Sequence, residues 1–403
     1  MISTFNLRIN FFLFKIRHYL LSYNHHKQIT CNLINIKKIS QKFSLNSKNT
    51  QERLVSKSYA AFILQSKSRP LLSLLILEFL SILLILPTVF YFFIKKSNSR
   101  KINCKSIKLV KYADVAFTIP KKLSKNSKTL ILKNHELNLV DLSLIFNIFF
   151  FTLKMGYFFN FQFMLKCIKE ISLYSPIIKS HKFKNLIVFL EFDCCISIIT
   201  LLCKKNNKKI INIQHGDQVI SAHYAFVEVD DFYFWNRNYY KMFQKMKVKC
   251  KPFFFNRFKK LKLKYNKKYV YILEPQLIHF GYNKKIFNNF IIELRKKLII
   301  LNKKYQVIFR CHPRYCNSQV VNFFKSKDIT IENAKERSTS SMIRSSICII
   351  GTWSALFVEA SMSNKRVILL KCELTKVLKK YHFLFNQKNV KYVDIKKLKI
   401  NEI

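Results

Sequence analysis

Residues 347–370 read ICIIGTWSALFVEASMSNKRVILL, and this stretch decides the fold. An apolar run over 347–350 is followed by a turn, a helical run over 355–362 and a second apolar run over 367–370. The order strand, tight turn, helix, strand is the βαβ unit of a parallel sheet. The stretch therefore predicts an α/β protein.

The turn of this unit carries the groups of an anion site. Gly351, Thr352 and Ser354 supply a glycine and two hydroxyls, and the helix start supplies free backbone N–H groups. Parallel sheets bind anions at the carboxyl ends of their strands. We therefore expect Gly351, Thr352 and Ser354 to bind phosphate, and Glu359 has the length to reach a ribose hydroxyl.

The same alternation extends back along the chain and falls into two similar halves, separated by a basic, weakly patterned stretch near 249–265. Strands alternating with helices predict parallel sheets covered on both faces. We expect a basic N-terminal region over 1–105, an N-terminal Rossmann-like domain over 106–255 and a C-terminal one over 265–403. The expected strands lie at 185–192, 209–214, 232–235, 269–273, 306–311 and 329–331, and the helices at 194–203, 284–301, 318–325 and 339–345.

Residues 71–94 form the most apolar segment of the chain, with Glu78 as its single charge. Twenty-four such residues are long enough to span a bilayer, but a carboxylate near the middle is costly in lipid. A membrane span, a helix on the membrane surface and a buried helix therefore all remain open. The Phe-rich segment 144–165, broken by Lys154 and Gly156, predicts a core or membrane-facing helix.

The chain of 403 residues carries 72 Lys and Arg against 21 Asp and Glu, a net charge of +51. Such a charge suits nucleic acid, an anionic membrane or an anionic substrate. Lys, Asn, Ile and Phe are abundant throughout, which favours compositional drift as the main source of the charge. No aromatic residues recur at a spacing typical of RNA binding, so we expect no specific nucleic-acid partner.

The scarce residue types are informative against this background. Only four glycines are present, and two of them lie in the turns discussed here. Eleven cysteines show no CxxC pair, which favours a reducing compartment and no metal site. The acidic pair Asp230–Asp231 is expected ahead of a strand, and no DxD motif stands at a strand end.

Two further motifs follow apolar runs. Gln214-His215-Gly216-Asp217 follows the run 209–214, where His215 is either a general base, a phosphate ligand or a turn residue capping backbone. Arg310-Cys311-His312-Pro313-Arg314 ends the run 306–311. Pro313 restricts His312 to extended geometry. Arg310 and Arg314 carry guanidinium groups that suit phosphate. The alternative is that the segment is a solvated basic turn.

These pieces together resemble bacterial GT-B glycosyltransferases of surface polysaccharide (capsule and lipooligosaccharide) synthesis. The resemblance covers about residues 180–375 and is closest to the branch of capsule transferases and CDP-glycerol glycerophosphotransferases. It rests on QHG at 214–216, HPR at 312–314, and IGTWSALFVEA at 350–360 preceded by STSSMIRSS at 338–346.

The resemblance implies two Rossmann-like domains facing a cleft. It also implies that His215 is the base that deprotonates the acceptor hydroxyl. His312, Thr352 and Ser354 would bind the donor phosphates, and Glu359 would bind the ribose. The chain departs from the glycerophosphotransferase motif at Asp217-Gln218, which makes a nucleotide sugar the expected donor. Bacterial sialyltransferases use a carboxylate base, so Asp217, Glu191 or Asp193 are alternatives to His215.

We therefore expect a membrane-associated inverting glycosyltransferase that needs no metal and no cofactor beyond a nucleotide-activated sugar. Its other partners would be a lipid-linked or polysaccharide acceptor and an anionic membrane surface. It would lie at the cytoplasmic face of the inner membrane, peripheral or with a single span. The alternatives are a glycerol-phosphate or polyol-phosphate transferase of the same fold, a nucleotide-sugar 2-epimerase, an inactive transferase, and a non-enzymatic basic protein that binds polyanions or membranes.

Overall fold

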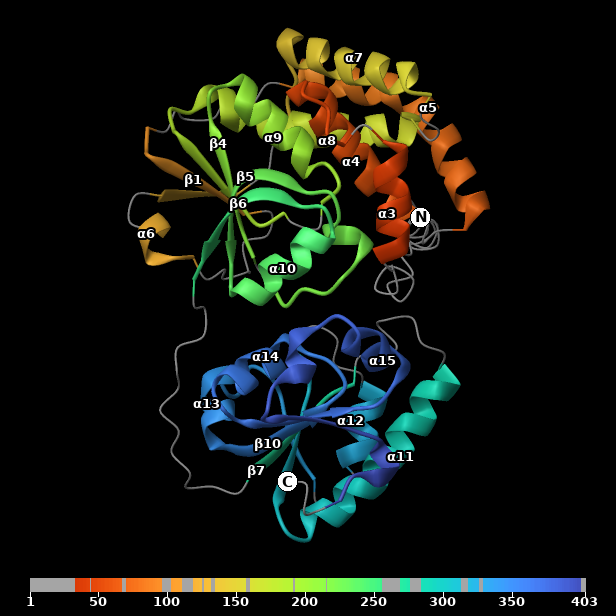
Figure 1. Ribbon diagram of the computed structural model, residues 1–403, viewed down its shortest axis with the longest axis vertical. Helices are drawn as coiled ribbons and strands as arrows, with labels where there is room; N and C mark the ends of the chain where they lie inside the picture. Colours follow the sequence, from red (N-terminus) through yellow and green to blue (C-terminus); the bar gives the residue numbers. More distant parts are fainter. Residues whose placement is uncertain are drawn as a thin grey trace, which may run out of the picture. The chain divides into compact units, whose positions relative to one another are not determined.

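The computed structural model groups the chain into two compact units, one of residues 1–215 and 221–255 and one of residues 216–220 and 256–403 (Figure 1). Residues 216–220 thus pack in the second unit, although the stretches before and after them in the sequence belong to the first. The structure describes residues 33–43, 45–66, 70–95, 103–110, 119–124, 127–131, 135–156, 160–190, 193–214, 216–255, 269–275, 284–312, 318–325 and 329–399.

The first unit is built on a six-stranded sheet of order β2-β1-β3-β4-β5-β6, in which every neighbouring pair is parallel. Its central strands β3 and β4 are largely apolar, as expected where a sheet is covered on both faces. Ile187, Phe189, Ile211 and Ile213 form a buried cluster over β3 and β4. The strands are β1 (Ser106–Val110), β2 (Ser127–Ile131), β3 (Asn185–Val188), β4 (Lys209–Ile213), β5 (Glu228–Phe234) and β6 (Lys249–Phe254).

The N-terminal helices belong to this first unit. Helix α4 packs on α9 and is held to the start of β5 by two cations on one carboxylate. Arg53 and Lys57 of α4 both contact Glu228, at 3.1 and 2.7 Å, and all three side chains are largely buried. The helices of this unit are α3 (Leu33–Lys42), α4 (Thr50–Ser66), α5 (Leu71–Ile94), α6 (Lys121–Ser124), α7 (Leu139–Lys154), α8 (Asn160–Ser180), α9 (Ile196–Lys205) and α10 (Arg237–Lys245), with the 3₁₀ turn η1 (Ala222–Tyr224).

The apolar segments form three helices, because the Phe-rich segment is split in two. Helices α5 and α7 each pack on α8, and Figure 1 draws both at the outer edge of the unit. The chain turns between α7 and α8 near Gly156, whose φ of +61° is the left-handed conformation in which helices commonly end. Among the described residues, α5 is the one helix long and apolar enough to cross a membrane.

The second unit has its own parallel sheet, of order β12-β11-β10-β7-β8-β9. Counted from β7, this is the Rossmann order 3-2-1-4-5-6, in which the strand order reverses between β7 and β10. The strands are β7 (Tyr269–Leu273), β8 (Gln306–Arg310), β9 (Thr330–Glu332), β10 (Ser346–Gly351), β11 (Arg366–Leu370) and β12 (Val390–Val393). The helices are α11 (Lys284–Asn302), α12 (Ser318–Lys325), α13 (Thr339–Ser345), α14 (Ala355–Met362) and α15 (Glu373–Lys379), with the 3₁₀ turns η2 (Phe383–Asn386) and η3 (Ile395–Lys397).

The predicted α/β class with two Rossmann-like parallel sheets is confirmed. One expectation inside it is wrong, because Asp230 and Asp231 do not precede a strand but lie within β5. Lysine partners accompany them there, Lys204 at 3.7 Å from Asp230 and Lys209 at 2.7 Å from Asp231.

Candidate functional site

The carboxyl ends of β7, β8 and β10 surround a cavity of about 260 Å³ in the second unit. Strands β7 and β10 are the pair between which the strand order reverses, and open α/β sheets bind ligands outside the carboxyl ends at this place. The volume is just below the range of about 300–1,000 Å³ typical of small-molecule pockets, so it suits part of a nucleotide. The lining residues include predicted and unpredicted ones: Leu273, Glu274, Arg310, Cys311, His312, Ala334, Thr339, Trp353, Ser354 and Leu356.

His312 and Glu274 join the ends of two neighbouring strands. Glu274 follows β7, is 6 % exposed, and accepts a hydrogen bond of 2.8 Å from the backbone N–H of His312 through Oε2. The half-buried His312 follows β8 and lines the cavity, as the sequence predicts for a residue held at a strand end. The cavity thus brings an imidazole and a carboxylate to the same strand ends.

Arg310 lines the cavity, but its guanidinium group is bonded to acceptors within the protein. Nη1 pairs closely with Glu332, and Nη2 donates to the carbonyl oxygens of Ala334 and Arg337 at 3.1 and 2.7 Å. The sequence predicted that Arg310 binds phosphate. In the structure these bonds instead hold residues 334–337, the segment before α13, in place. A buried ion pair of this kind depends on both partners being present.

A second arginine takes part in the same network of bonds. Arg337 donates to the hydroxyl of Tyr271 at 2.5 Å and pairs with Glu332 at 3.4 Å, and Tyr271 in turn donates to Glu332 at 3.3 Å. Burial is the main cause that raises the pKa of Tyr271 above its ordinary value. The phenol therefore stays protonated and donates its hydrogen bond to Glu332.

The turn after β10 is built by close packing. A Cβ on Gly351 would lie 2.9 Å from Cζ of Phe357 and 3.3 Å from both Cβ and the carbonyl oxygen of Leu273. Only glycine therefore lets β10 pass the end of β7 and turn into α14. Ser354 caps α14 by accepting a hydrogen bond of 3.3 Å from the N–H of Leu356, and it lines the cavity.

The other two predicted residues of this region lie apart from the lining. Thr352 is buried, at 2 % exposure. Glu359 lies half-buried on α14, outside the set of residues that line the cavity. The structure therefore groups His312, Ser354 and Arg310 at one cavity and places Thr352 and Glu359 beside it.

Asp217, one of the alternative bases, is buried against His382. Its Oδ1 lies 3.0 Å from Nε2 of His382, and the two side chains are 3 % and 0 % exposed. Because the N–H of Leu384 donates to Nδ1 of His382 at 3.2 Å, Nε2 carries the proton and donates it to the carboxylate. Trp353 contacts the same imidazole edge-to-face at 4.7 Å, so this pair supports the wall of the cavity.

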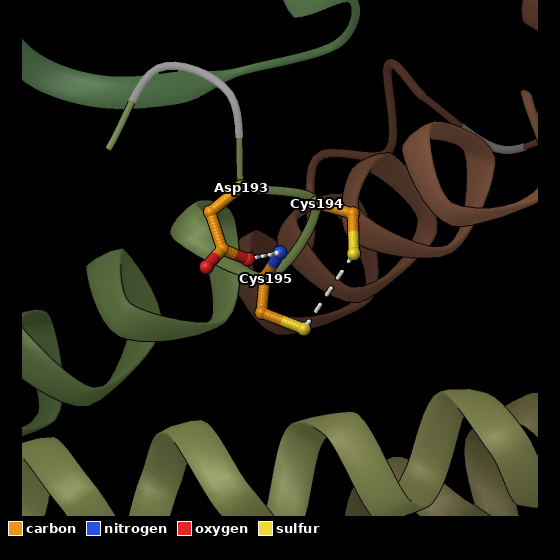
Figure 2. Close-up of side chains that lie close together, drawn as sticks. All are labelled: Asp193, Cys194 and Cys195. Atoms are coloured by element: carbon orange, nitrogen blue, oxygen red, sulfur yellow. Dashed lines mark hydrogen bonds between the residues drawn. The ribbon is translucent and has the colours of Figure 1, made fainter. Parts of the chain in front are cut away.

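Asp193, another alternative base, lies in the first unit beside two thiols (Figure 2). Its Oδ1 accepts a hydrogen bond of 2.9 Å from the N–H of Cys195, and the sulfurs of Cys194 and Cys195 are 3.9 Å apart. One possible metal-ligand atom from each of the three residues, the carboxylate oxygen or the sulfur, lies within 4.8 Å of the other two. A hydrogen bond with Cys195, together with burial, raises the pKa of Cys194, and a hydrogen bond with Cys167, together with burial, raises the pKa of Cys195. The thiolate form that a metal requires is therefore disfavoured.

Three of the predicted site residues, His215, Glu191 and Arg314, lie outside the described residues. The sequence also missed residues of the site, chiefly Glu274, Thr339 and His382. Glu274 had a usable signal, since it directly follows a predicted strand in a chain with only 21 acidic residues. His382 had none, because its partner Asp217 is 165 positions away.

Comparisons with known proteins give only distant likenesses. No family model matches the chain, and no curated protein matches its sequence. Among solved structures, the glycotransferase of kitacinnamycin is 6 % identical with a TM-score of 0.37, covering 75 % of this chain and 88 % of its own. A chain named as a UDP-N-acetylglucosamine 2-epimerase from Listeria monocytogenes is 9 % identical with a TM-score of 0.41, covering 73 % and 85 %.

An α/β-galactoside α-2,3-sialyltransferase from Photobacterium phosphoreum is 11 % identical with a TM-score of 0.36, covering 75 % of this chain and 100 % of its own. Likenesses at this level carry no argument about substrate or mechanism. The functional argument rests on the site itself.

Proposed function

We propose that the chain is a glycosyltransferase that moves a sugar from a nucleotide-activated donor to a surface-polysaccharide or lipid-linked acceptor. The observation that carries the proposal is the cavity at the reversal of a Rossmann-order sheet, lined by His312, Glu274 and the capped start of α14. Nucleotides bind at this place in such sheets, and the N-terminus of a helix favours phosphate.

The donor phosphates would lie between His312 and the start of α14, where Ser354 offers a hydroxyl. The buried carboxylate of Glu274 would repel phosphate but accept hydrogen bonds from hydroxyl groups, so it would face the ribose or the sugar. Glu359 is the second candidate for the ribose. Arg310 would act as a positioning residue through the segment it braces, and Arg314 as a further phosphate ligand.

The reaction would be a single displacement at the anomeric carbon. The acceptor hydroxyl loses its proton to a base, for which His215 is our candidate, and its oxygen bonds to the sugar as the bond to the phosphate oxygen breaks. Negative charge then grows on the departing nucleotide, and donors already in place for that charge lower the barrier. His312, Ser354 and Thr352 with the N–H groups of α14 are the candidate donors, and the mechanism assigns no step to a metal or other cofactor.

The proposal extends to the acceptor and the location, for which the net charge of the chain is the support. We place the protein on the cytoplasmic face of the inner membrane, where nucleotide sugars are available to lipid-linked acceptors. An anionic membrane surface would attract a chain of net charge +51.

The test is nucleotide binding by the full chain in detergent, measured by calorimetry and thermal shift against CMP, CDP, UDP, GDP and UDP-sugars at moderate salt. We expect saturable binding of one base, weakened at least tenfold by His312→Ala, by Glu359→Ala and by Ser354→Ala. His223→Ala, a half-buried histidine of the first unit, is the matched control for His312. Asn236→Ala, which removes the cap of α10, is the control for Ser354.

Two outcomes contradict the proposal. Equal binding of every nucleotide that disappears with salt and is unchanged in the variants would identify a polyanion binder. Saturable binding followed by conversion of the sugar without transfer to any acceptor would identify an epimerase.

A further inference from the structure

Helix α5 has an inverted polarity. Its few polar residues face the protein: Ser73 and Ser81 are each 4 % exposed, and Glu78 and Thr88 are half-buried. Its outward side chains are large and apolar, with exposures of 37–77 %. A soluble helix carries the opposite pattern. The outer face of α5 is defined by Leu71, Leu72, Leu75, Ile76, Phe79, Leu80, Ile82, Leu83, Leu84, Leu86, Phe90, Tyr91, Phe93 and Ile94.

The helix is held to the folded unit at two places, at Glu78 in its first half and at Phe92 near its end. The two carboxylate oxygens of Glu78 accept hydrogen bonds of 2.8 and 3.0 Å from the N–H groups of Phe161 and Gln162, at the start of α8. Farther along, the carbonyl oxygen of Phe92 accepts a bond of 2.9 Å from the N–H of Leu137, and its ring stacks on His135 at 4.6 Å. The charge that would be costly in lipid is thus satisfied inside the protein.

These two attachments decide between a span and a helix in the membrane plane. Glu78 and Phe92 are 14 positions apart, about 21 Å at 1.5 Å per residue. A bilayer core is about 30 Å thick. Because the two attachments are closer together than the core is thick, an α5 that crossed it would draw at least one of the attached segments, the start of α8 or the segment leading into α7, into hydrocarbon. A helix lying along the surface keeps both attachments and buries only its outer face.

Helix α7 offers a second apolar surface on the same support, α8. Two of its polar residues also turn inward, since Asp141 is bound by Ser175 and Lys179 at 2.7 Å each and Thr152 by Asn160. Its exposed side chains include five large apolar ones with exposures of 47–73 %: Leu139, Val140, Phe146, Phe150 and Leu153. Ser143 and Asn147 interrupt this set, so α5 is the main apolar surface and α7 an extension.

The net charge favours lipid over a second copy of the chain. Two molecules of charge +51 repel each other, whereas a leaflet rich in anionic lipids attracts each of them. Exposed apolar surfaces as extended as this one mark interaction sites with proteins or membranes. An apolar helix with basic residues on both sides in the sequence, here Lys67 and Arg69 before it and Lys95 and Lys96 after it, is typical of a helix that lies in the membrane interface.

We propose that α5, extended by α7, lies in the plane of one leaflet of an anionic membrane and anchors the first unit there without crossing the bilayer. This deepens the membrane partner of the proposed function. It does not depend on the donor site, because every residue that carries it lies in the first unit.

The first test is flotation of the full chain with vesicles of phosphatidylcholine and phosphatidylglycerol. The variant Phe79→Gln/Leu83→Gln/Phe90→Gln changes three outer side chains, and we expect its partition coefficient to fall at least tenfold. The control Ile286→Gln/Ile292→Gln/Ile300→Gln changes three exposed isoleucines of α11, in the second unit, with exposures of 44–50 %. It should float as the wild type does. Equal flotation of the two triple variants would overturn the proposal.

The second test measures depth with brominated lipids, using Leu72→Trp, Leu83→Trp and Ile94→Trp in turn and the wild type as the background. A helix in the plane predicts similar, shallow depths at all three positions. A span predicts Leu83→Trp near the bilayer centre and the other two near opposite surfaces, and that result would overturn the in-plane arrangement. Loss of self-association in the first triple variant, without vesicle binding by the wild type, would instead identify an interface between copies.

Discussion

At the scale of single residues, the site depends on a carboxylate that the sequence analysis passed over. Glu274 fixes the backbone of His312 and also lines the cavity. It directly follows β7, one of the two strands between which the strand order reverses. A positively charged turn was expected here. In the described part of the cavity, Arg310 is paired with Glu332 inside the protein, and Glu274 adds a carboxylate to the lining.

Glu274→Gln separates these two roles, because the amide oxygen can still accept the bond from His312. We expect donor affinity to fall about 10- to 100-fold, since a hydrogen bond to a charged group contributes about 1.5–3 kcal/mol. Thermal stability should change little. Calorimetry with the nucleotide found above measures the effect, and Glu336→Gln, which changes an exposed carboxylate bound to Asn333, should leave affinity unchanged. Unaltered affinity in Glu274→Gln would remove Glu274 from the donor site.

Gly351 is required for a steric reason. In Gly351→Ala the new Cβ would press on Phe357 and Leu273, and overpacking of this kind costs about 1–3 kcal/mol. We expect a lower midpoint in thermal unfolding and weaker nucleotide binding together, because the turn carries Ser354. Gly216→Ala is the contrasting variant, since its nearest atom would be Nε2 of Gln218 at an ordinary 3.8 Å. Equal midpoints for the two variants would contradict the packing argument.

At the scale of elements, most of the second sheet could be predicted because buried parallel strands are continuous apolar runs. The bounds expected for β7, α12, α13, α14 and α5 agree with the structure to the residue. Edge strands such as β2 and β12, which contain lysine, have a weaker pattern and were not predicted. The partnership of Asp217 with His382 joins distant parts of the sequence, and no local pattern encodes such a contact.

The attachment of α4 to β5 predicts a dependence of stability on pH. Burial raises the pKa of Glu228, but the charges and hydrogen bonds of Lys57 and Arg53 outweigh it, so the pKa lies below its ordinary value of 4.5. A carboxylate of this kind contributes stability above its unfolded pKa and loses it as the pH falls through the folded pKa. Burial lowers the pKa of Lys57 more than Glu228 raises it, but that shift acts on the alkaline side.

Glu228→Gln should therefore destabilise the first unit at pH 7 by about 3–5 kcal/mol, because two buried cations lose their partner. The wild type should approach the variant as the pH falls from about 5 to about 3. Urea unfolding at several pH values measures both effects. Glu293→Gln, which removes an exposed carboxylate from Lys296, serves as the control. A difference between wild type and Glu228→Gln that stayed constant across the acid range would show that the carboxylate does not titrate as argued.

At the scale of the whole molecule, the charge of +51 and the apolar face of α5 should make separable contributions to membrane binding. Attraction between exposed lysines and anionic lipid is screened within a Debye length of about 10 Å at 0.1 M salt and about 3 Å at 1 M. Burial of apolar side chains is not screened by salt. Drift in composition can raise the charge, but it does not explain why the polar residues of one apolar helix all face the protein.

We therefore expect a residual affinity that salt cannot remove. Raising salt from 0.1 to 1 M should reduce binding of the wild type to anionic vesicles down to its level on phosphatidylcholine alone, and no further. The variant Phe79→Gln/Leu83→Gln/Phe90→Gln should bind anionic vesicles at low salt through charge and bind neither kind of vesicle at high salt. Flotation at both salt concentrations measures this. If high salt released the wild type from every vesicle, charge alone would hold the protein to the membrane, and the outer face of α5 would need a protein partner instead.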